Sequence, residues 1–248
     1  MTKHTEGVKY IPGTYAKKRK TVAQLAQHYI SDWNKTRIEI KVKDKQKIIP
    51  PTICFSRKIG VGALEIADIL SEKIGYRVVD RQIIEQIAKE GKLREKTVAY
   101  FDERYPGVRN EFISLMIGEK SFIMSDYFKH LSNVVFSIAG MEPTIFVGRG
   151  THLILPRDRV LAVRFIGSRA FRVKRLAKIL KVSSSEAERK LDEVDKEQKN
   201  FFKKIFGKKD ALSYEFDLVI NCDYLQKPEW GANIVRQAFK EKFYEENL

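Results

Sequence analysis

The strongest constraint on the fold is a regular alternation of short apolar runs with longer segments of helical periodicity, which begins at Thr52. The apolar runs predict strands, whereas apolar residues spaced three and four apart predict helices. The predicted strands are Thr52–Phe55, Arg77–Val79, Thr144–Val147, Val160–Ile166 and Asp217–Ile220. The predicted helices are Ala63–Ile74, Gln82–Glu90, Lys92–Glu103, Ser121–Ala139, Ala170–Leu180, Ser185–Phe206 and Glu229–Tyr244.

Strands that are separated by helices are typical of a parallel sheet covered on both faces. Because crossovers between parallel strands are right-handed, the pattern predicts an α/β fold with a three-layer, doubly wound sheet of five parallel strands. Ligands of such sheets bind beyond the carboxyl ends of the strands. The residues that follow each predicted strand are therefore the candidate site residues.

A turn with two glycines follows the first predicted strand, in the sequence SRKIGVGA at Ser56–Ala63. Glycines allow the backbone to approach a phosphate closely, and the helix behind them directs free N–H groups at the anion. The standard phosphate loop carries Gly-Lys-Ser/Thr, whereas this chain has Gly62-Ala63-Leu64, which supplies neither lysine nor hydroxyl. An ordinary turn between strand and helix is the alternative. The candidate phosphate-binding residues are Ser56, Arg57, Lys58, Gly60, Val61, Gly62, Ala63 and Leu64.

The second and third predicted strands also end in charged residues. Asp80 is a candidate for contact with a ribose, a base or a water on Mg²⁺, and Arg81 for contact with a phosphate. The alternative for Asp80 is an N-cap of the helix that begins at Gln82. Arg149 stands between two glycines, and its planar guanidinium suits bidentate phosphate recognition. A surface ion pair is the alternative for Arg149.

Two arginines begin the helix after the fourth strand. Arg172 and Arg175 share a helix face because they are three residues apart, so that they can clamp a transferring phosphoryl group. A solvated basic face is the alternative. The charged segment Ser183–Gly207, which includes Asp195, predicts a helical lid that closes over nucleotides. For this segment the alternative is a surface helix whose phenylalanines pack inward.

The positive charge is unevenly distributed along the chain. The net charge is +15, and residues 1–50 contribute +8 of it, with 12 Lys+Arg against 4 Asp+Glu. We therefore expect a basic N-terminal extension over residues 1–50, with a short helix at 21–33 and a strand at Ile38–Val42, followed by a folded domain over residues 51–248. A basic extension attracts nucleic acid or an anionic surface, and a solvated lysine face is the alternative.

The remaining composition favours a soluble cytoplasmic protein. Cys54 and Cys222 lie far apart in or beside predicted strands, which fits a reducing compartment. No apolar run approaches the roughly 20 residues that cross a bilayer, and the first residues lack the apolar core of a secretory signal. Four scattered histidines predict no metal site, so any metal ligands are unknown at this point.

Six segments, in this order, resemble the cytidylate kinase-like family, whose members are relatives of bacterial CMP kinase among the P-loop nucleoside-monophosphate kinases. The resemblance runs from about Ile53 to Leu225. It implies that residues 51–248 form a nucleotide-kinase-like domain with a helical lid. It also implies transfer of the ATP γ-phosphoryl group to CMP, dCMP or a similar acceptor, with Mg²⁺. The six segments are SRKIGVGALEIADILSEKIGYRVVDRQII, FDERYPG at Phe101–Gly107, VGRGTHLIL at Val147–Leu155, FIGSRAFRVKRL at Phe165–Leu176, EVDKEQKNFFKKIFG at Glu193–Gly207 and FDLVINCDYL at Phe216–Leu225.

The resemblance implies a role for each candidate residue. In chain order, these roles are the phosphate loop (Gly60 and Gly62), the monophosphate site (Asp80, Arg81 and Arg149), the transferring phosphates (Arg172 and Arg175) and the lid (Asp195). The predicted catalytic residues are Arg149, Arg172, Arg175 and Asp195.

The chain departs from the family at charge-bearing positions. Val61, Ala63 and Leu64 replace the family's Ser, Gly and Arg, and Gln198 stands where members often have Arg. Losing a cation that stabilises phosphoryl transfer lowers the rate by roughly 10³-fold or more.

Three hypotheses follow: a nucleoside-monophosphate kinase-like phosphotransferase, a catalytically degenerate nucleotide sensor, and a nucleic-acid or anionic-surface binder that uses residues 1–50.

Overall fold

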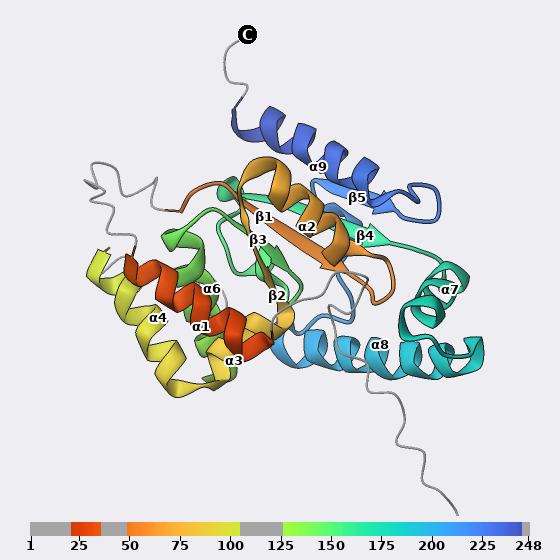
Figure 1. Cartoon of the computed structure of the whole chain (residues 1–248), viewed down its shortest axis with the longest axis horizontal. Helices are drawn as coiled ribbons and strands as arrows, with labels where there is room; N and C mark the ends of the chain where they lie inside the picture. Colours follow the sequence, from red (N-terminus) through yellow and green to blue (C-terminus); the bar gives the residue numbers. More distant parts are fainter. Residues whose placement is uncertain (1–20, 36–48, 105–125, 245–248) are drawn as a thin grey trace, which may run out of the picture.

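The computed structural model describes residues 21–35, 49–104 and 126–244. These residues form an α/β fold around a sheet of five parallel strands (Figure 1). The strand order across the sheet is β2-β3-β1-β4-β5. The predicted fold class is therefore confirmed. The strands are β1 (Thr52–Arg57), β2 (Arg77–Asp80), β3 (Thr144–Val147), β4 (Val160–Ile166) and β5 (Leu218–Asn221).

The central strand, β1, is buried on both of its faces. Ile53 pairs with Ile145 of β3 on one side and with Leu161 of β4 on the other. Because successive side chains of a strand point to opposite faces, Cys54 packs into one core and Phe55 into the other. Burial on both faces explains why the strand is apolar throughout.

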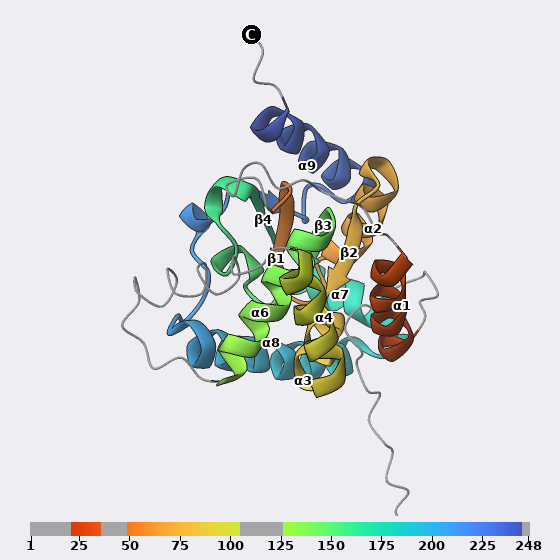
Figure 2. The same cartoon turned by 90° about the vertical axis from the view of Figure 1, so that its left-hand side faces the viewer.

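Helices cover the two faces of the sheet (Figure 2). On one face α2 and α9 pack against each other, and on the other α3 packs against α6. The helix α1 packs against α3 and α4. The helices are α1 (Val22–Lys35), α2 (Ala63–Ile74), α3 (Arg81–Lys89), α4 (Gly91–Arg104), α6 (Asp126–Met141), α7 (Arg169–Leu180), α8 (Ser184–Phe206) and α9 (Pro228–Phe243).

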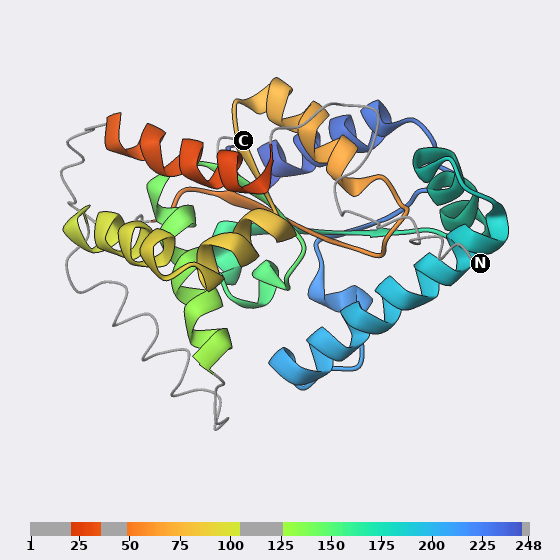
Figure 3. The same ribbon diagram turned by 60° about the horizontal axis from the view of Figure 1, so that its bottom comes forward.

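The helix α7 and the beginning of α8 lie together at the opposite end of the molecule from α1 and α4 (Figure 3). Serine caps define where both begin: Ser168 accepts a hydrogen bond from the Phe171 N–H and Ser183 from the Glu186 N–H, each at 3.2 Å. A small separate core joins the two helices to the turn after β1. Its buried members are Ile59, Val173, Leu176, Ala187, Leu191 and Val194.

Several predicted segments fall outside the described residues. These are residues 1–20, the predicted strand Ile38–Val42, the beginning of the predicted helix Ser121–Ala139 and the last part of the FDERYPG segment. The division of the chain at residue 50 therefore stays a prediction. Among the described residues, no helix combines the length and the apolar character needed to cross a membrane.

Candidate functional site

The turn after β1 is shaped by two glycines in the left-handed region of the backbone map. Gly60 has φ 88° and Gly62 has φ 86°, and Gly62 is the N-cap residue of α2. A Cβ at Gly60 would lie 2.9 Å from the carbonyl oxygen of Arg172, and one at Gly62 would lie 2.9 Å from Arg175 Nη2. Glycine is therefore needed at both positions, because α7 is pressed against the turn.

The candidate phosphate-binding residues separate into two groups. The side chains of Val61, Ala63 and Leu64 are buried in the apolar core with α2, so that these side chains are not available to an anion. Ser56 is also buried, and its hydroxyl accepts a hydrogen bond from Arg164 Nη1 at 3.3 Å. Lys58 instead lines an open cavity between α8 and the end of β1.

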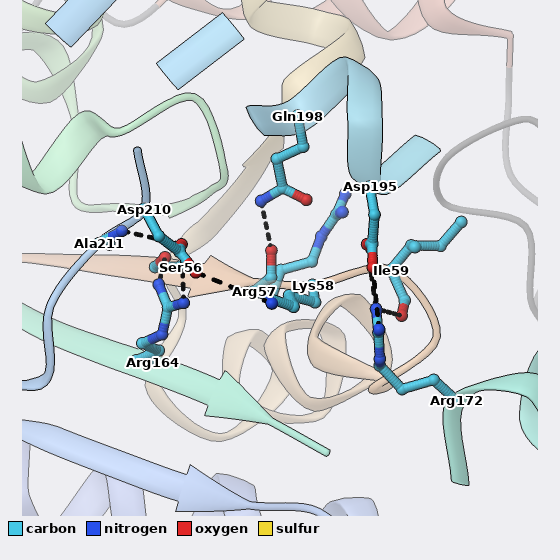
Figure 4. Close-up of polar contacts among 10 residues, drawn as sticks. All are labelled: Ser56, Arg57, Lys58, Ile59, Arg164, Arg172, Asp195, Gln198, Asp210 and Ala211. Atoms are coloured by element: carbon cyan, nitrogen blue, oxygen red, sulfur yellow. Dashed lines mark hydrogen bonds and ion pairs between the residues drawn. The ribbon is translucent and has the colours of Figure 1, made fainter. Parts of the chain in front are cut away.

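The predicted catalytic residues Arg172 and Asp195 bind each other across α7 and α8 (Figure 4). Arg172 donates two hydrogen bonds to the Asp195 carboxylate, at 3.0 and 2.9 Å, and a weaker one to the Ile59 carbonyl oxygen at 3.4 Å. The Arg172 side chain is only 7% exposed. Arg175, one turn further along α7, pairs with Glu65 at the start of α2. Both arginines thus flank the turn with their charge already balanced by a carboxylate.

Gln198, which stands where the family often has arginine, ties α8 to the turn. Its Nε2 donates a hydrogen bond to the Arg57 carbonyl oxygen at 2.7 Å (Figure 4). The amide therefore satisfies a backbone acceptor of the turn and fixes the distance between α8 and β1. Sequence reasoning did not find this contact, because a main-chain acceptor leaves no signal in the residue pattern.

A second polar network joins β1 and β4 to the segment after α8. Arg164 donates to Asp210 at 3.0 Å as well as to Ser56, and Lys58 lies 3.8 Å from Asp210 (Figure 4). Burial alone would raise the pKa of Asp210, but the N–H of Ala211 and the positive charges of Arg164 and Lys58 together lower it. Sequence reasoning missed this network. The signal was Arg164, a charged residue inside the otherwise apolar strand β4.

The residues that were predicted to bind the monophosphate lie at the ends of β2 and β3. Asp80 is buried and caps α3, with its carboxylate accepting hydrogen bonds from the N–H groups of Gln82 and Ile83 at 2.9 and 3.1 Å. This cap explains why α3 begins at Arg81, one residue before the predicted start at Gln82.

Arg149 does not extend freely into the site. It pairs with Glu85 of α3, which also lies 3.7 Å from Arg81, and its guanidinium stacks on Phe201 of α8 with 4.0 Å to the ring centroid. Burial, with the positive charges of Arg81 and Arg57, lowers the pKa of Arg149 to about 9. The backbone of Arg149 has φ 57°, a conformation that is uncommon for residues other than glycine. The structure therefore brings Arg81 and Arg149 together around one carboxylate.

A cavity of about 490 Å³ lies between α8 and the end of β1. This volume is in the range of small-molecule sites, which is roughly 300–1,000 Å³. Its walls carry more positive than negative groups. The lining residues are Lys58, Asp195, Lys196, Gln198, Lys199, Phe202, Lys209 and Asp210.

The residues around the turn do not fit a protein-held Mg²⁺. The oxygen ligands that Mg²⁺ prefers are present in Asp195, Asp210 and Ser56, but each already accepts hydrogen bonds from an arginine. The positions that follow Gly62 are apolar and buried. Among residues 21–35, 49–104 and 126–244, no three His, Cys, Asp or Glu side chains are grouped as metal ligands would be. We therefore derive no step through a metal ion that the protein itself holds.

The comparison with solved structures finds similar chains at low sequence identity, and the first of them agrees with this fold. Among solved structures, an uncharacterised protein from Eubacterium ventriosum is similar with a TM-score of 0.58 at 17% sequence identity, over 77% of this chain and 98% of that one. A shikimate kinase from Bacteroides thetaiotaomicron has a TM-score of 0.38 at 12% identity, over 77% and 96% of the two chains. A dephospho-CoA kinase from Campylobacter jejuni has a TM-score of 0.31 at 13% identity, over 78% of this chain and 97% of that one.

At the level of sequence, no curated protein matches the chain. The model of the cytidylate kinase-like family, however, matches residues 52–224, which include all five strands and every candidate site residue. The chain therefore belongs to the cytidylate kinase-like family.

Proposed function

We propose that the protein is a nucleoside-monophosphate kinase-like phosphotransferase that moves the γ-phosphoryl group of ATP to CMP, dCMP or a similar acceptor. A phosphate oxygen of the acceptor forms a bond to the γ-phosphorus, the bond from that phosphorus to its bridging oxygen breaks, and ADP leaves. Membership of the family supports the reaction class, and the resemblance to CMP kinase supports the acceptor.

One observation carries the proposal: neighbouring parallel strands bring the candidate phosphate-binding residues to one edge of the sheet. Arg81 follows β2, Arg149 follows β3 and the glycine turn follows β1, and these three strands are adjacent. Adjacent strands lie about 4.8 Å apart. Phosphoryl transfer depends on alignment and positive charge more than on covalent chemistry, so that two arginines and a glycine turn at one edge support the proposal.

The test is a coupled assay of ADP release with ATP and a panel of monophosphates, which includes CMP, dCMP, UMP and AMP. Arg149→Ala should lower kcat/KM by roughly 10³-fold, since an arginine that binds transferring phosphates contributes about that much. Arg77→Ala is the matched control, because Arg77 is an ion-paired arginine at the opposite end of β2. Release of ADP with none of the acceptors, beside measurable ATP binding, would overturn the proposal.

A second candidate function is a nucleotide-binding sensor without turnover. The observation in its favour is that each predicted catalytic arginine is ion-paired with a carboxylate of the protein. The pairs are Arg149–Glu85, Arg172–Asp195 and Arg175–Glu65. ATP binding with no ADP release would favour the sensor, whereas turnover with any acceptor would exclude it.

Binding of nucleic acid or an anionic surface through residues 1–50 stays a prediction. The +8 charge of this segment supports it. Full-length protein and a chain without residues 1–50 should then differ in retention on RNA, DNA and anionic liposomes at low salt. Equal retention would exclude this function.

A further inference from the structure

The cavity between α8 and the end of β1 has positive charge on opposite walls. Lys196 and Lys199 are three residues apart in α8 and therefore project from one face of that helix. Lys58 faces them from the turn after β1, and Lys209 belongs to the segment that follows α8. The buried ring of Phe202 supplies an apolar part of the wall.

The two carboxylates of the cavity do not balance this charge. Asp195 is engaged by both Nη atoms of Arg172, and Asp210 is engaged by Arg164 at 3.0 Å and lies 3.8 Å from Lys58. No carboxylate within residues 21–35, 49–104 and 126–244 is ion-paired with the three other lysines of the wall. These are Lys196, Lys199 and Lys209.

The side of the glycines that faces α7, in contrast, is already filled. The positions where side chains at Gly60 and Gly62 would lie are taken by the main chain of Arg172 and the guanidinium of Arg175. The charges of those two arginines are balanced by Asp195 and Glu65. An anion that bound there would have to displace a carboxylate from a buried or half-buried ion pair, which is costly. In the cavity it would meet the ammonium groups of Lys196, Lys199 and Lys209, which have no such partner among the described residues.

We propose that this lysine-lined cavity binds a linear triphosphate chain, with the ammonium groups of Lys58, Lys196, Lys199 and Lys209 neutralising its charge in place of a metal held by the protein. Lysine suits this task because its ammonium is a compact charge on a flexible stem with three donors. That this triphosphate is the one carried by the donor ATP rests on the proposed function. The anion site itself rests on the cavity and its charges alone.

The test uses inorganic tripolyphosphate as the probe, with binding to the full-length protein measured by titration calorimetry in EDTA. Lys196→Gln/Lys199→Gln should raise the Kd by about 25-fold, since each charged contact in an open site contributes about a factor of 5. Lys203→Gln/Lys204→Gln is the matched control, because it removes the same charge from the same helix outside the cavity. We expect the control to change the Kd less than about threefold.

Two further measurements identify the molecule that supplies the triphosphate and the role of the metal ion. ATP binding should weaken in the cavity variant by a factor similar to that for tripolyphosphate, if the triphosphate of the nucleotide enters the same cavity. Added Mg²⁺ should weaken tripolyphosphate binding to the wild type, because the cation competes with the lysines for the phosphates.

The inference would be overturned by equal effects of the two double variants, by wild-type protein that binds no tripolyphosphate, or by binding that requires Mg²⁺. The proposed function fails separately. A protein that binds tripolyphosphate and ATP through these lysines but releases no ADP with any acceptor retains the anion site and loses the kinase activity.

Discussion

The buried ion pair between α7 and α8 gives the sharpest test of how the chain uses its candidate catalytic residues. Asp195→Asn changes the charge with little change of shape and leaves Arg172, which is 7% exposed, without its anion. Removing one partner of a buried pair costs about 3–5 kcal/mol. Because the Asp195 side chain is 26% exposed and asparagine keeps one acceptor, we expect a loss of about 2 kcal/mol in the free energy of unfolding.

Urea denaturation followed by circular dichroism measures this loss. With a slope of about 3 kcal/mol per M, at the upper end for small domains, the midpoint should fall by about 0.7 M. Asp192→Asn is the matched control, because Asp192 forms the same two-bond pair with Arg169 across the same helices, at the same spacing of 23 residues, but both side chains are exposed. Exposed pairs contribute little, so the control should leave the midpoint unchanged.

Two outcomes would refute this reasoning. Equal midpoints for Asp195→Asn and Asp192→Asn would show that burial of the ion pair does not determine the loss in the free energy of unfolding. A normal midpoint together with lost turnover would show that Asp195 acts on the substrate and not on Arg172. The double variant Arg172→Met/Asp195→Leu provides the complementary check, since apolar replacement of both partners should recover part of the lost stability.

Gly150→Ala should lower the free energy of unfolding by about 2–4 kcal/mol in the same urea assay, because position 150 has φ 66° and a Cβ there would lie 2.5 Å from the Phe206 ring. A change below about 0.5 kcal/mol would contradict this close contact. Burial lowers the pKa of His152 to about 4, although Glu215 opposes the shift. The unfolded chain therefore takes up this proton first, and stability is lost as the pH falls from about 6.5 to about 4, by up to about 3 kcal/mol. The slope of melting temperature against pH in this window should flatten in His152→Asn, and an unchanged slope would exclude His152 as its source. Burial, with the charges of Asp80 and Glu72, raises the pKa of Asp68 to about 7, so that its contribution to stability falls as the pH rises from about 4 to about 7. Asp68→Asn should therefore raise the melting temperature at pH 8 relative to its effect at pH 4, and equal effects at both pH values would contradict the raised pKa.

The sheet could be predicted from the sequence because its strands are buried on both faces. A short, continuous apolar run such as Thr144–Val147 is typical of a strand that is buried on both faces. The helix α2 ends at Ile74, as predicted, and Gly75 caps it. The boundaries that differ are set by caps. Asp80 begins α3 one residue early through hydrogen bonds that a pattern of apolar residues does not contain.

The edge at which the candidate residues gather was predictable, but their ion pairs were not. Because the strands are parallel, Arg149 and the glycine turn were expected at the same edge of the sheet, and the structure has them there. Which carboxylate balances which arginine depends on tertiary contacts, such as that between Arg172 and Asp195, and residue types alone do not determine these. The cavity lysines of α8 were not distinguishable from other exposed lysines of the same helix before its orientation was known.

The attachment of α8 has a consequence for the kinetics of ligand exchange. Its first half is fastened to α7 through Leu191 and Asp195, whereas its second half is fastened to the core beneath the sheet through Phe202 and Phe206. A helix that is anchored along both halves has no free end about which to swing. We therefore expect ligands to enter and leave the open cavity without movement of α8, so that the dissociation rate does not depend on local unfolding of this helix.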